Sequence, residues 1–196
     1  ARLKGHPCII QLVESSVDRA TGLVLMLMEL GEIDLSKLLA QQAAAEATDN
    51  DKKGKGRLSL NFVRFVWEQM LRAVHCVHEE RIVHGDLKPA NFVFVRGRLK
   101  LIDFGIAKAI GNDTTNIMRE SQVGTVNYMS PEAILDTGNG REQPGMGGRR
   151  APCMKIGRAS DVWSLGCILY QLVYGKTPFA DLNLIQKLHC IVDERY

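Results

Sequence analysis

Two short β-prone runs, at residues 92–95 and 99–102, lie on either side of an Arg-Gly dipeptide at 96–97. Strand-like runs joined by a tight-turn dipeptide predict a β-hairpin. A hairpin returns the chain to the edge from which it started. The string HGDLKPAN (84–91) comes directly before this hairpin and the string DFG (103–105) directly after it. We therefore expect the polar side chains of the two strings to converge.

These side chains suit the transfer of a phosphoryl group. Such a transfer needs metal ions that bridge the phosphates, a carboxylate at the incoming hydroxyl and a fixed in-line geometry. Asp103 and Asn91 offer the hard oxygen ligands that Mg²⁺ prefers. Asp86 is expected to accept the proton of a substrate hydroxyl, and Lys88 to offset the charge of the transferring phosphate. These four residues are the candidate catalytic residues, and Asn91 and Asp103 are also the candidate metal ligands.

Further strings support this interpretation. A lone D-F-G is more simply explained as a strand end followed by a turn. Here H-x-D-x-K-x-x-N, the hairpin and D-F-G are followed by GTVNYMSPE (124–132) and DVWSLG (161–166). This set, in this order, is the signature of protein kinases. The chain resembles a eukaryotic protein kinase over essentially all of its 196 residues.

Longer strings are more specific than the general kinase set. They are MELGxIDL (28–35), VHGDLKPANF (83–92), DTT (113–115), SQVGTVNYM (121–129) and YGKTPF (174–179). Through them the chain resembles the monopolar-spindle dual-specificity kinases of the spindle checkpoint. The resemblance implies a kinase that uses ATP and Mg²⁺ and phosphorylates Ser or Thr of protein substrates, with Tyr left open. It also implies mitotic checkpoint signalling, in the nucleus or cytoplasm, at the kinetochore and spindle.

The same resemblance implies an α+β, protein-kinase-like fold in one partial kinase domain over residues 1–196. Residues 1–30 would form the end of the N-lobe and the hinge, with two strands. Residues 31–196 would form the mostly helical C-lobe, with the hairpin at the catalytic cleft. No glycine-rich loop, strand lysine or αC glutamate precedes Cys8. We therefore expect a fragment of an active enzyme that is inactive on its own, because the missing groups fix the phosphates of ATP.

The resemblance also assigns a nucleotide site. Met28 corresponds to the gatekeeper, which is also a core strand residue, and residues 29–31 correspond to the hinge, whose backbone would bind adenine. Val93 and Ile102 would pack beneath the adenine, and Asp34 would lie near the ribose. The candidate nucleotide-binding residues are Met28, Glu29, Gly31, Asp34, Val93 and Ile102.

Residues after the D-F-G string complete the implied site. Lys88 and Thr125 resemble the serine/threonine class, in which Thr125 helps to position Asp86 and Lys88, so the resemblance makes Thr125 a fifth candidate catalytic residue. Gly85 replaces the usual Arg, so a phosphorylated activation loop would need other contacts. A second copy of the protein is a candidate partner for autophosphorylation in trans. The candidate autophosphorylation sites are Thr114, Thr115, Ser121 and Thr125. Glu132 would normally pair with an Arg of a later helix that the chain does not contain.

Two other functions compete with a protein kinase. A pseudokinase or docking module would keep the fold without catalysis, but the intact Asp86, Lys88, Asn91 and Asp103 argue against such a loss. A small-molecule or lipid kinase is disfavoured by residues 124–132, which in protein kinases bind a peptide.

Composition argues against other classes. The net charge of +3 comes from scattered Lys and Arg, so nucleic acid is not an expected partner. No apolar run reaches the roughly 20 residues of a membrane span. The five cysteines are odd in number and widely spaced, which favours neither a disulfide framework nor a zinc site.

The remaining pattern predicts these elements: strands at 8–13 and 23–29, a helix from Asp34 to about Ala40, a solvated loop at 41–57, a long amphipathic helix capped by Ser59, a buried helix at 161–174 capped by Ser160 and stopped by Gly175, and a last helix from Asp181.

Overall fold

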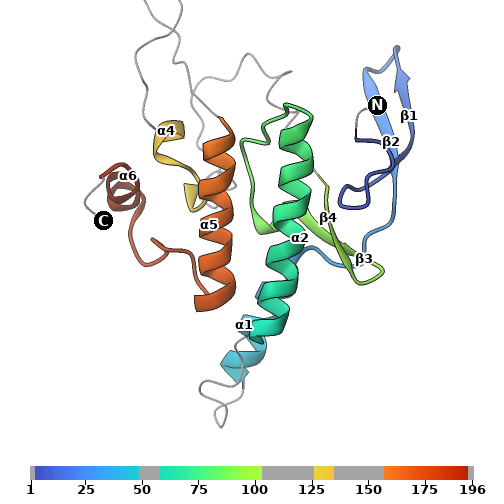
Figure 1. Cartoon of the computed structure of the whole chain (residues 1–196). Helices are drawn as coiled ribbons and strands as arrows, with labels where there is room; N and C mark the ends of the chain where they lie inside the picture. Colours follow the sequence, from blue (N-terminus) through green and yellow to red (C-terminus); the bar gives the residue numbers. More distant parts are fainter. Residues whose placement is uncertain (1–2, 49–57, 103–125, 135–156, 194–196) are drawn as a thin grey trace, which may run out of the picture. The chain divides into compact units, whose positions relative to one another are not determined.

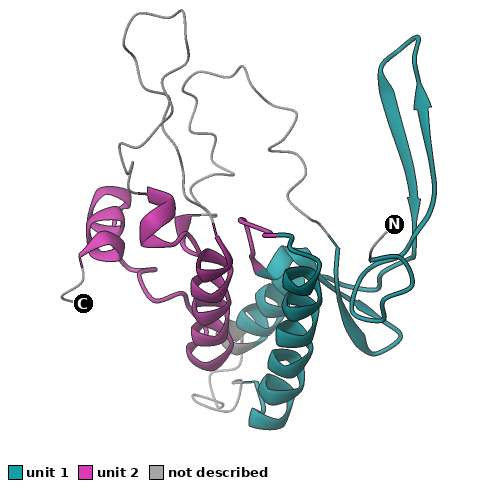
Figure 2. Ribbon diagram, turned by 45° about the horizontal axis from the view of Figure 1, so that its top comes forward, with its two compact units in different colours: residues 1–82, 89–104 teal, residues 83–88, 105–196 magenta. Residues whose placement is uncertain are grey.

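The computed structural model describes residues 3–48, 58–102, 126–134 and 157–193. They belong to two compact units, coloured separately in Figure 2. Unit 1 comprises residues 1–82 and 89–104, and unit 2 comprises residues 83–88 and 105–196. These units are defined by compactness and not by lobes, so the predicted boundary at residue 30 stays a prediction.

Helices and small antiparallel sheets make up the described residues, which confirms the α+β class (Figure 1). Unit 1 contains β1 (Leu12–Asp18), β2 (Leu23–Met28), α1 (Leu35–Thr48), α2 (Leu60–Glu79), the 3₁₀ turn η1 (Pro89–Asn91), β3 (Phe92–Val95) and β4 (Arg98–Leu101). Unit 2 contains α4 (Pro131–Ile134), α5 (Arg158–Tyr174) and α6 (Leu184–Val192). None of the described helices is both long enough and apolar enough to cross a membrane.

The β3–β4 hairpin forms as predicted. Its register pairs Phe92 with Leu101 and Val95 with Arg98. Arg96 and Gly97 have φ values of 50° and 73°, and two positive φ angles are what a two-residue hairpin turn of type I′ requires. Phe92 and Leu101 are fully buried, so this small sheet belongs to the core of unit 1.

Helix α2 supports this hairpin. Ser59 Oγ accepts a hydrogen bond from Phe62 N at 3.2 Å, which confirms the predicted cap. The apolar face of α2 is buried and packs on β4. Gln69 adds a polar link, because its Oε1 accepts from Leu99 N at 2.8 Å. The hairpin is thus held by both apolar packing and a side-chain hydrogen bond.

The first predicted strand is wrong in its bounds. β1 begins at Leu12 and continues to Asp18, because its pairing with β2 uses backbone groups and so extends through polar residues. The segment before it pairs with β4 instead: Leu101 N donates to Cys8 O at 2.9 Å, and Ile10 N donates to Leu101 O at 3.0 Å. This segment therefore joins the β3–β4 core of unit 1.

Helix α1 is longer than predicted. Asp34 caps it as expected, with Oδ1 accepting from Lys37 N at 2.9 Å. The expected end near Ala40 is wrong, since the helix runs to Thr48. Residues 41–48 (QQAAAEAT) lack apolar anchors but are rich in Ala, Gln and Glu, which are strong helix formers. The rest of the predicted loop, at 49–57, lies outside the described residues.

In unit 2, Gly175 ends α5 as predicted, with φ 78° and its N–H donating to Gln171 O. The start of α5 was predicted wrongly, because the helix begins at Arg158 and Ser160 lies inside its first turn. The predicted burial is also incomplete, since Val162 is 62% exposed within the described residues.

Helix α6 also begins later than predicted. Asn183 caps it, with Oδ1 accepting from Gln186 N at 2.9 Å. Asp181, the predicted start, instead forms an ion pair with Lys176.

Two glycine-to-alanine substitutions should change the free energy of unfolding in opposite directions. Gly97 has φ +73°, which alanine adopts only with strain, so Gly97→Ala should lower it by about 1–2 kcal/mol. Gly166 lies inside α5 with nothing within 4 Å of an added Cβ, so Gly166→Ala should raise it by about 0.5–1 kcal/mol. Chemical denaturation measures both changes, and equal signs would contradict the described backbone.

Candidate active site

The predicted catalytic loop begins in unit 2, where a buried carboxylate holds its backbone. Asp161 Oδ2 accepts from His84 N at 3.0 Å, and Asp161 Oδ1 accepts from Gly85 N at 2.8 Å. The Asp161 residue is 0% exposed. A buried carboxylate is stable only when hydrogen bonds replace its lost water. Asp161 therefore fixes the loop to the first turn of α5.

Gly85 explains part of the loop's shape. Its φ is 77°, a left-handed conformation in which a residue with a Cβ is strained. A glycine at this position reaches Asp161 without that strain. The departure from the usual Arg is therefore compatible with a well-formed loop.

The two predicted catalytic side chains of this loop lie together. Lys88 Nζ is 3.1 Å from Asp86 Oδ2, and the side chains are 33% and 29% exposed. Asp86 N donates to His84 Nδ1 at 3.2 Å, which further fixes the backbone at Asp86. The result is a partly exposed carboxylate with an ammonium group beside it.

Asn91 lies in unit 1, at the end of η1. It is 4% exposed, and its carbonyl accepts from Ile102 N at 2.9 Å. The hairpin thus brings Asn91 beside Ile102, and the predicted convergence of the Asp86, Asn91 and Asp103 side chains stays a prediction. Asp103 and Thr125 themselves lie outside the described residues. An amide oxygen and a carboxylate are suitable donors for Mg²⁺, so the residue types fit this metal.

Unit 1 also contains every candidate nucleotide-binding residue. The segment that directly follows the candidate hinge runs beside β3. Glu32 N donates to Phe94 O at 2.8 Å, and Phe94 N donates to Ile33 O at 2.9 Å. Asp34 forms an antiparallel bridge with Val93. A Cβ on Gly31 would lie 2.1 Å from Val93 Cγ1, so this close approach requires glycine.

The predicted floor of the nucleotide site forms one apolar cluster. Val93 packs with Ile10 and Val95, and the partly buried Ile102 packs against them. The candidate gatekeeper, Met28, ends β2 and is 39% exposed. The Asp34 carboxylate accepts the capping hydrogen bond of α1 through Oδ1, and its Oδ2 lies 3.2 Å from Lys37 Nζ. Its expected place near a ribose stays a prediction.

Residues 126–134 include most of the predicted peptide-binding string at 124–132 and are anchored within unit 2. Tyr128 OH donates to Gln171 Oε1 at 2.7 Å, and Ser164 Oγ donates to Tyr128 O at 2.7 Å. Burial raises the pKa of Tyr128 to about 12, so its hydroxyl stays protonated and can donate. Two side chains of α5 therefore hold Tyr128, Gln171 through its hydroxyl and Ser164 through its backbone carbonyl.

Glu132 has a partner other than the expected Arg. Its Oε1 accepts from Ser160 Oγ at 2.7 Å. Burial alone would raise the pKa of Glu132, but the Ser160 hydrogen bond opposes it and the pKa is lowered on balance. Ser160 thus joins α4 to α5.

Two residues that make long-range polar contacts, Asp161 with residues 84–85 and Lys100 with Glu29, were missed by the sequence analysis. Asp161 stood in a recognised string, but its role appears only when its contacts with His84 and Gly85 are seen. Lys100 stands between two leucines of the hairpin, and this interruption of an apolar run was the signal that could have drawn attention to it.

The chain is similar to proteins of a known family. The family described as "Protein kinase domain" matches residues 1–195. The chain therefore belongs to the protein kinase family. Members of this family transfer phosphate from ATP, typically with Mg²⁺.

The relatives are more specific. The chain is 51% identical to the "Probable serine/threonine-protein kinase mps1" of Dictyostelium discoideum and 52% identical to the "Serine/threonine-protein kinase mph1" of Schizosaccharomyces pombe, over its whole length in both cases. It is 46% identical, over 94% of its length, to the "Dual specificity protein kinase Ttk" of Danio rerio. It spans 18%, 26% and 16% of these three proteins. The predicted resemblance to monopolar-spindle kinases is confirmed.

Replacing Asp161 should destabilise the protein. Asp161→Asn turns one of two buried acceptors into a donor that faces a backbone N–H, so the free energy of unfolding should fall by about 2–4 kcal/mol. The control is Asp181→Asn, which removes an ion pair whose Asp181 side chain is 74% exposed and should cost less than about 1 kcal/mol. Denaturant titration compares them, and equal costs would contradict the anchoring role.

Proposed function

We propose that the protein is an ATP-dependent protein kinase that phosphorylates Ser or Thr of protein substrates, with Tyr also accepted, in spindle-checkpoint signalling. The observation that carries this proposal is the Asp86–Lys88 pair at 3.1 Å, on a loop that Asp161 fixes. A binding module needs no such preorganised pair. Family membership and the similarity to mps1, mph1 and Ttk kinases support the same activity.

Asp86 accepts the proton of the substrate hydroxyl and orients its oxygen for attack on the γ-phosphorus. Lys88 lies beside it and offsets negative charge on the phosphoryl group as the bond to the leaving oxygen breaks. The rigid loop matters because alignment of the two oxygens, and not covalent chemistry by the protein, lowers the barrier.

Asn91 and Asp103 would hold Mg²⁺, which neutralises phosphate charge when bound. Asn91 is held at the edge of the hairpin, where its carbonyl accepts the Ile102 amide. This contact holds the backbone of Asn91 beside Ile102.

The hinge supplies the adenine contacts. Within the described residues, no backbone hydrogen bond uses the carbonyl of Glu29 or the amide of Gly31. One acceptor and one donor two residues apart suit the edge of an adenine ring, with Val93 and Ile102 beneath it. ATP is the nucleotide that this arrangement serves.

Residues 126–134 provide the surface for the substrate peptide. A second copy of the protein is one such substrate, phosphorylated in trans. The checkpoint role would place the enzyme in the nucleus or cytoplasm, at the kinetochore and spindle. These statements rest on the similarity to relatives of which the chain spans between 16% and 26%.

Phosphate incorporation tests the activity. With the full-length protein, radiolabelled ATP and a protein substrate, Asp86→Asn and Asp103→Ala should each reduce incorporation by at least about a hundredfold. ATP binding by Asp86→Asn should change little, because Asp86 contacts the substrate hydroxyl. The matched control, Asp181→Asn, should incorporate phosphate as the unsubstituted protein does.

Two results would overturn the enzyme proposal. The first is the absence of incorporation by folded, unsubstituted protein, which would favour a pseudokinase or docking module. The second is incorporation by Asp86→Asn at the unsubstituted rate.

A further inference from the structure

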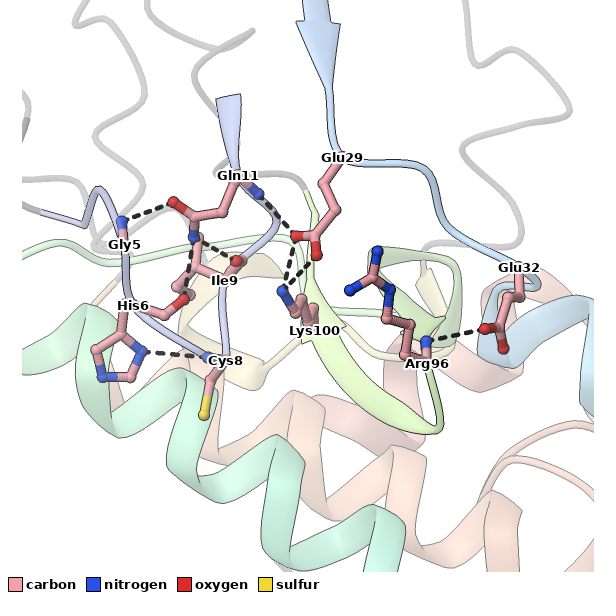
Figure 3. Close-up of polar contacts among 9 residues, drawn as sticks. All are labelled: Gly5, His6, Cys8, Ile9, Gln11, Glu29, Glu32, Arg96 and Lys100. Carbon is pink, nitrogen blue, oxygen red and sulfur yellow. Dashed lines mark hydrogen bonds and ion pairs between the residues drawn. The ribbon is translucent and has the colours of Figure 1, made fainter. Parts of the chain in front are cut away.

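An ion pair fastens the start of the hinge to the β3–β4 hairpin (Figure 3). The carboxylate oxygens of Glu29 lie 2.8 and 2.7 Å from Lys100 Nζ on β4. One of these oxygens also accepts from Gln11 N at 3.3 Å. The Glu29 side chain therefore connects the hinge both to β4 and to the segment that leads into β1.

This pair is more shielded than an ordinary surface pair. The side chains of Lys100 and Glu29 are 13% and 27% exposed, whereas those of Arg72 and Glu68 on α2 are 69% and 62% exposed. The hydrogen bond from Lys100 lowers the pKa of Glu29, which keeps its carboxylate charged. Partial burial reduces screening by salt, so the pair holds a defined geometry.

Lys100 is also connected to the floor of the proposed nucleotide site. It lies opposite Val93 in the register of the hairpin. Directly opposite residues share a face of a sheet, so the stem of Lys100 begins beside Val93. The ammonium group at its other end reaches Glu29. Lys100 thus spans from the floor of the site to the hinge at its edge.

The hinge is fixed on both sides of the groups that would bind adenine. Glu29 N donates to Gln11 O at 2.8 Å, and Glu32 N donates to Phe94 O at 2.8 Å. Glu32 Oε1 also accepts from Arg96 N at 2.8 Å, in the hairpin turn (Figure 3). Leu30, between these points, is 88% exposed and adds little packing. The Glu29 side chain is therefore an anchor at the residue whose carbonyl would bind adenine.

We propose that Lys100 and Glu29 are positioning residues for the nucleotide: their ion pair sets the hinge backbone relative to the floor formed by Val93 and Ile102. Neither charged group touches the nucleotide in this role. The pair orders the hinge before ATP binds. ATP binding therefore does not carry the loss of conformational entropy that ordering the hinge would require. This inference rests on the proposed function, because it assumes that adenine binds at the hinge.

The test separates nucleotide affinity from turnover. Lys100→Met keeps the apolar stem and removes the charge, and Glu29→Gln keeps the shape. In the full-length protein, each should weaken ATP binding about tenfold, measured by displacement of a fluorescent ATP analogue. For Lys100→Met, the kcat at saturating ATP and the KM for the substrate peptide should stay within about twofold of those of the unsubstituted protein. The double variant should bind ATP no more weakly than the weaker single variant, because both remove one interaction.

Arg72→Met is the matched control, since it breaks an exposed ion pair of the same unit, and it should leave the Kd for ATP unchanged. An unchanged Kd in Lys100→Met and Glu29→Gln would overturn the inference alone, provided that the unsubstituted protein binds ATP. Additive losses in the double variant, or equal losses in kcat and peptide affinity, would also overturn it by showing general damage. No ATP binding by the unsubstituted protein would overturn the proposed function as well. If Lys100→Met fails to fold, the isosteric Glu29→Gln decides.

Discussion

The hydrogen bonds that Asp161 accepts from His84 and Gly85 connect helix α5 to the predicted catalytic loop of unit 2. Leu165, Ile168 and Leu172 bury one face of α5, and this packing fixes the position of the Asp161 carboxylate. The carboxylate is cut off from water, so it is stabilised only while the loop backbone donates to it. The loop in turn carries Asp86 and Lys88. The packing of α5 and the alignment of the candidate catalytic pair, Asp86 and Lys88, therefore depend on each other.

In unit 1, a small β-sheet and not a buried carboxylate holds the candidate site residues in place. Helix α2 packs on the β3–β4 hairpin. The segment at 8–10 forms hydrogen bonds with β4, and the segment at 32–34, which follows the hinge, pairs with β3. Asn91 precedes the hairpin and Ile102 follows it. One small sheet thereby organises the candidate metal ligand Asn91, the apolar cluster proposed as the floor of the nucleotide site, and the candidate hinge. Backbone hydrogen bonds make most of these connections. The Lys100–Glu29 ion pair adds a side-chain connection between β4 and the start of the hinge.

Local signals explain which parts of the fold were predictable. The Arg96-Gly97 turn, the Ser59 cap and the Gly175 stop each depend on residues within a few positions, and all three were confirmed. The end of α1 was missed because residues 41–48 lack apolar anchors, although their intrinsic helix propensity is high. The first strand was misplaced because an apolar pattern does not reveal which backbone groups pair.

The candidate site shows the same limit. The identities of Asp86, Lys88 and Asn91 could be predicted from a motif, because phosphoryl transfer restricts the residue types that serve it. The contacts that hold them could not. Asp161 is 77 residues from His84, and Lys100 is 71 residues from Glu29, so only the folded chain brings each pair together. Asp103 and Thr125 lie outside the described residues, and their roles stay predictions.

The β1–β2 hairpin has a practical consequence. All six residues of β2, LVLMLM, are apolar, and each is at least 39% exposed within the described part of the chain. A strand of this composition with an accessible edge is a template on which further strands can add. Self-association through the β1–β2 hairpin is therefore the expected consequence at high concentration. A lysine or proline at an outward position of β2 is the change that would oppose aggregation.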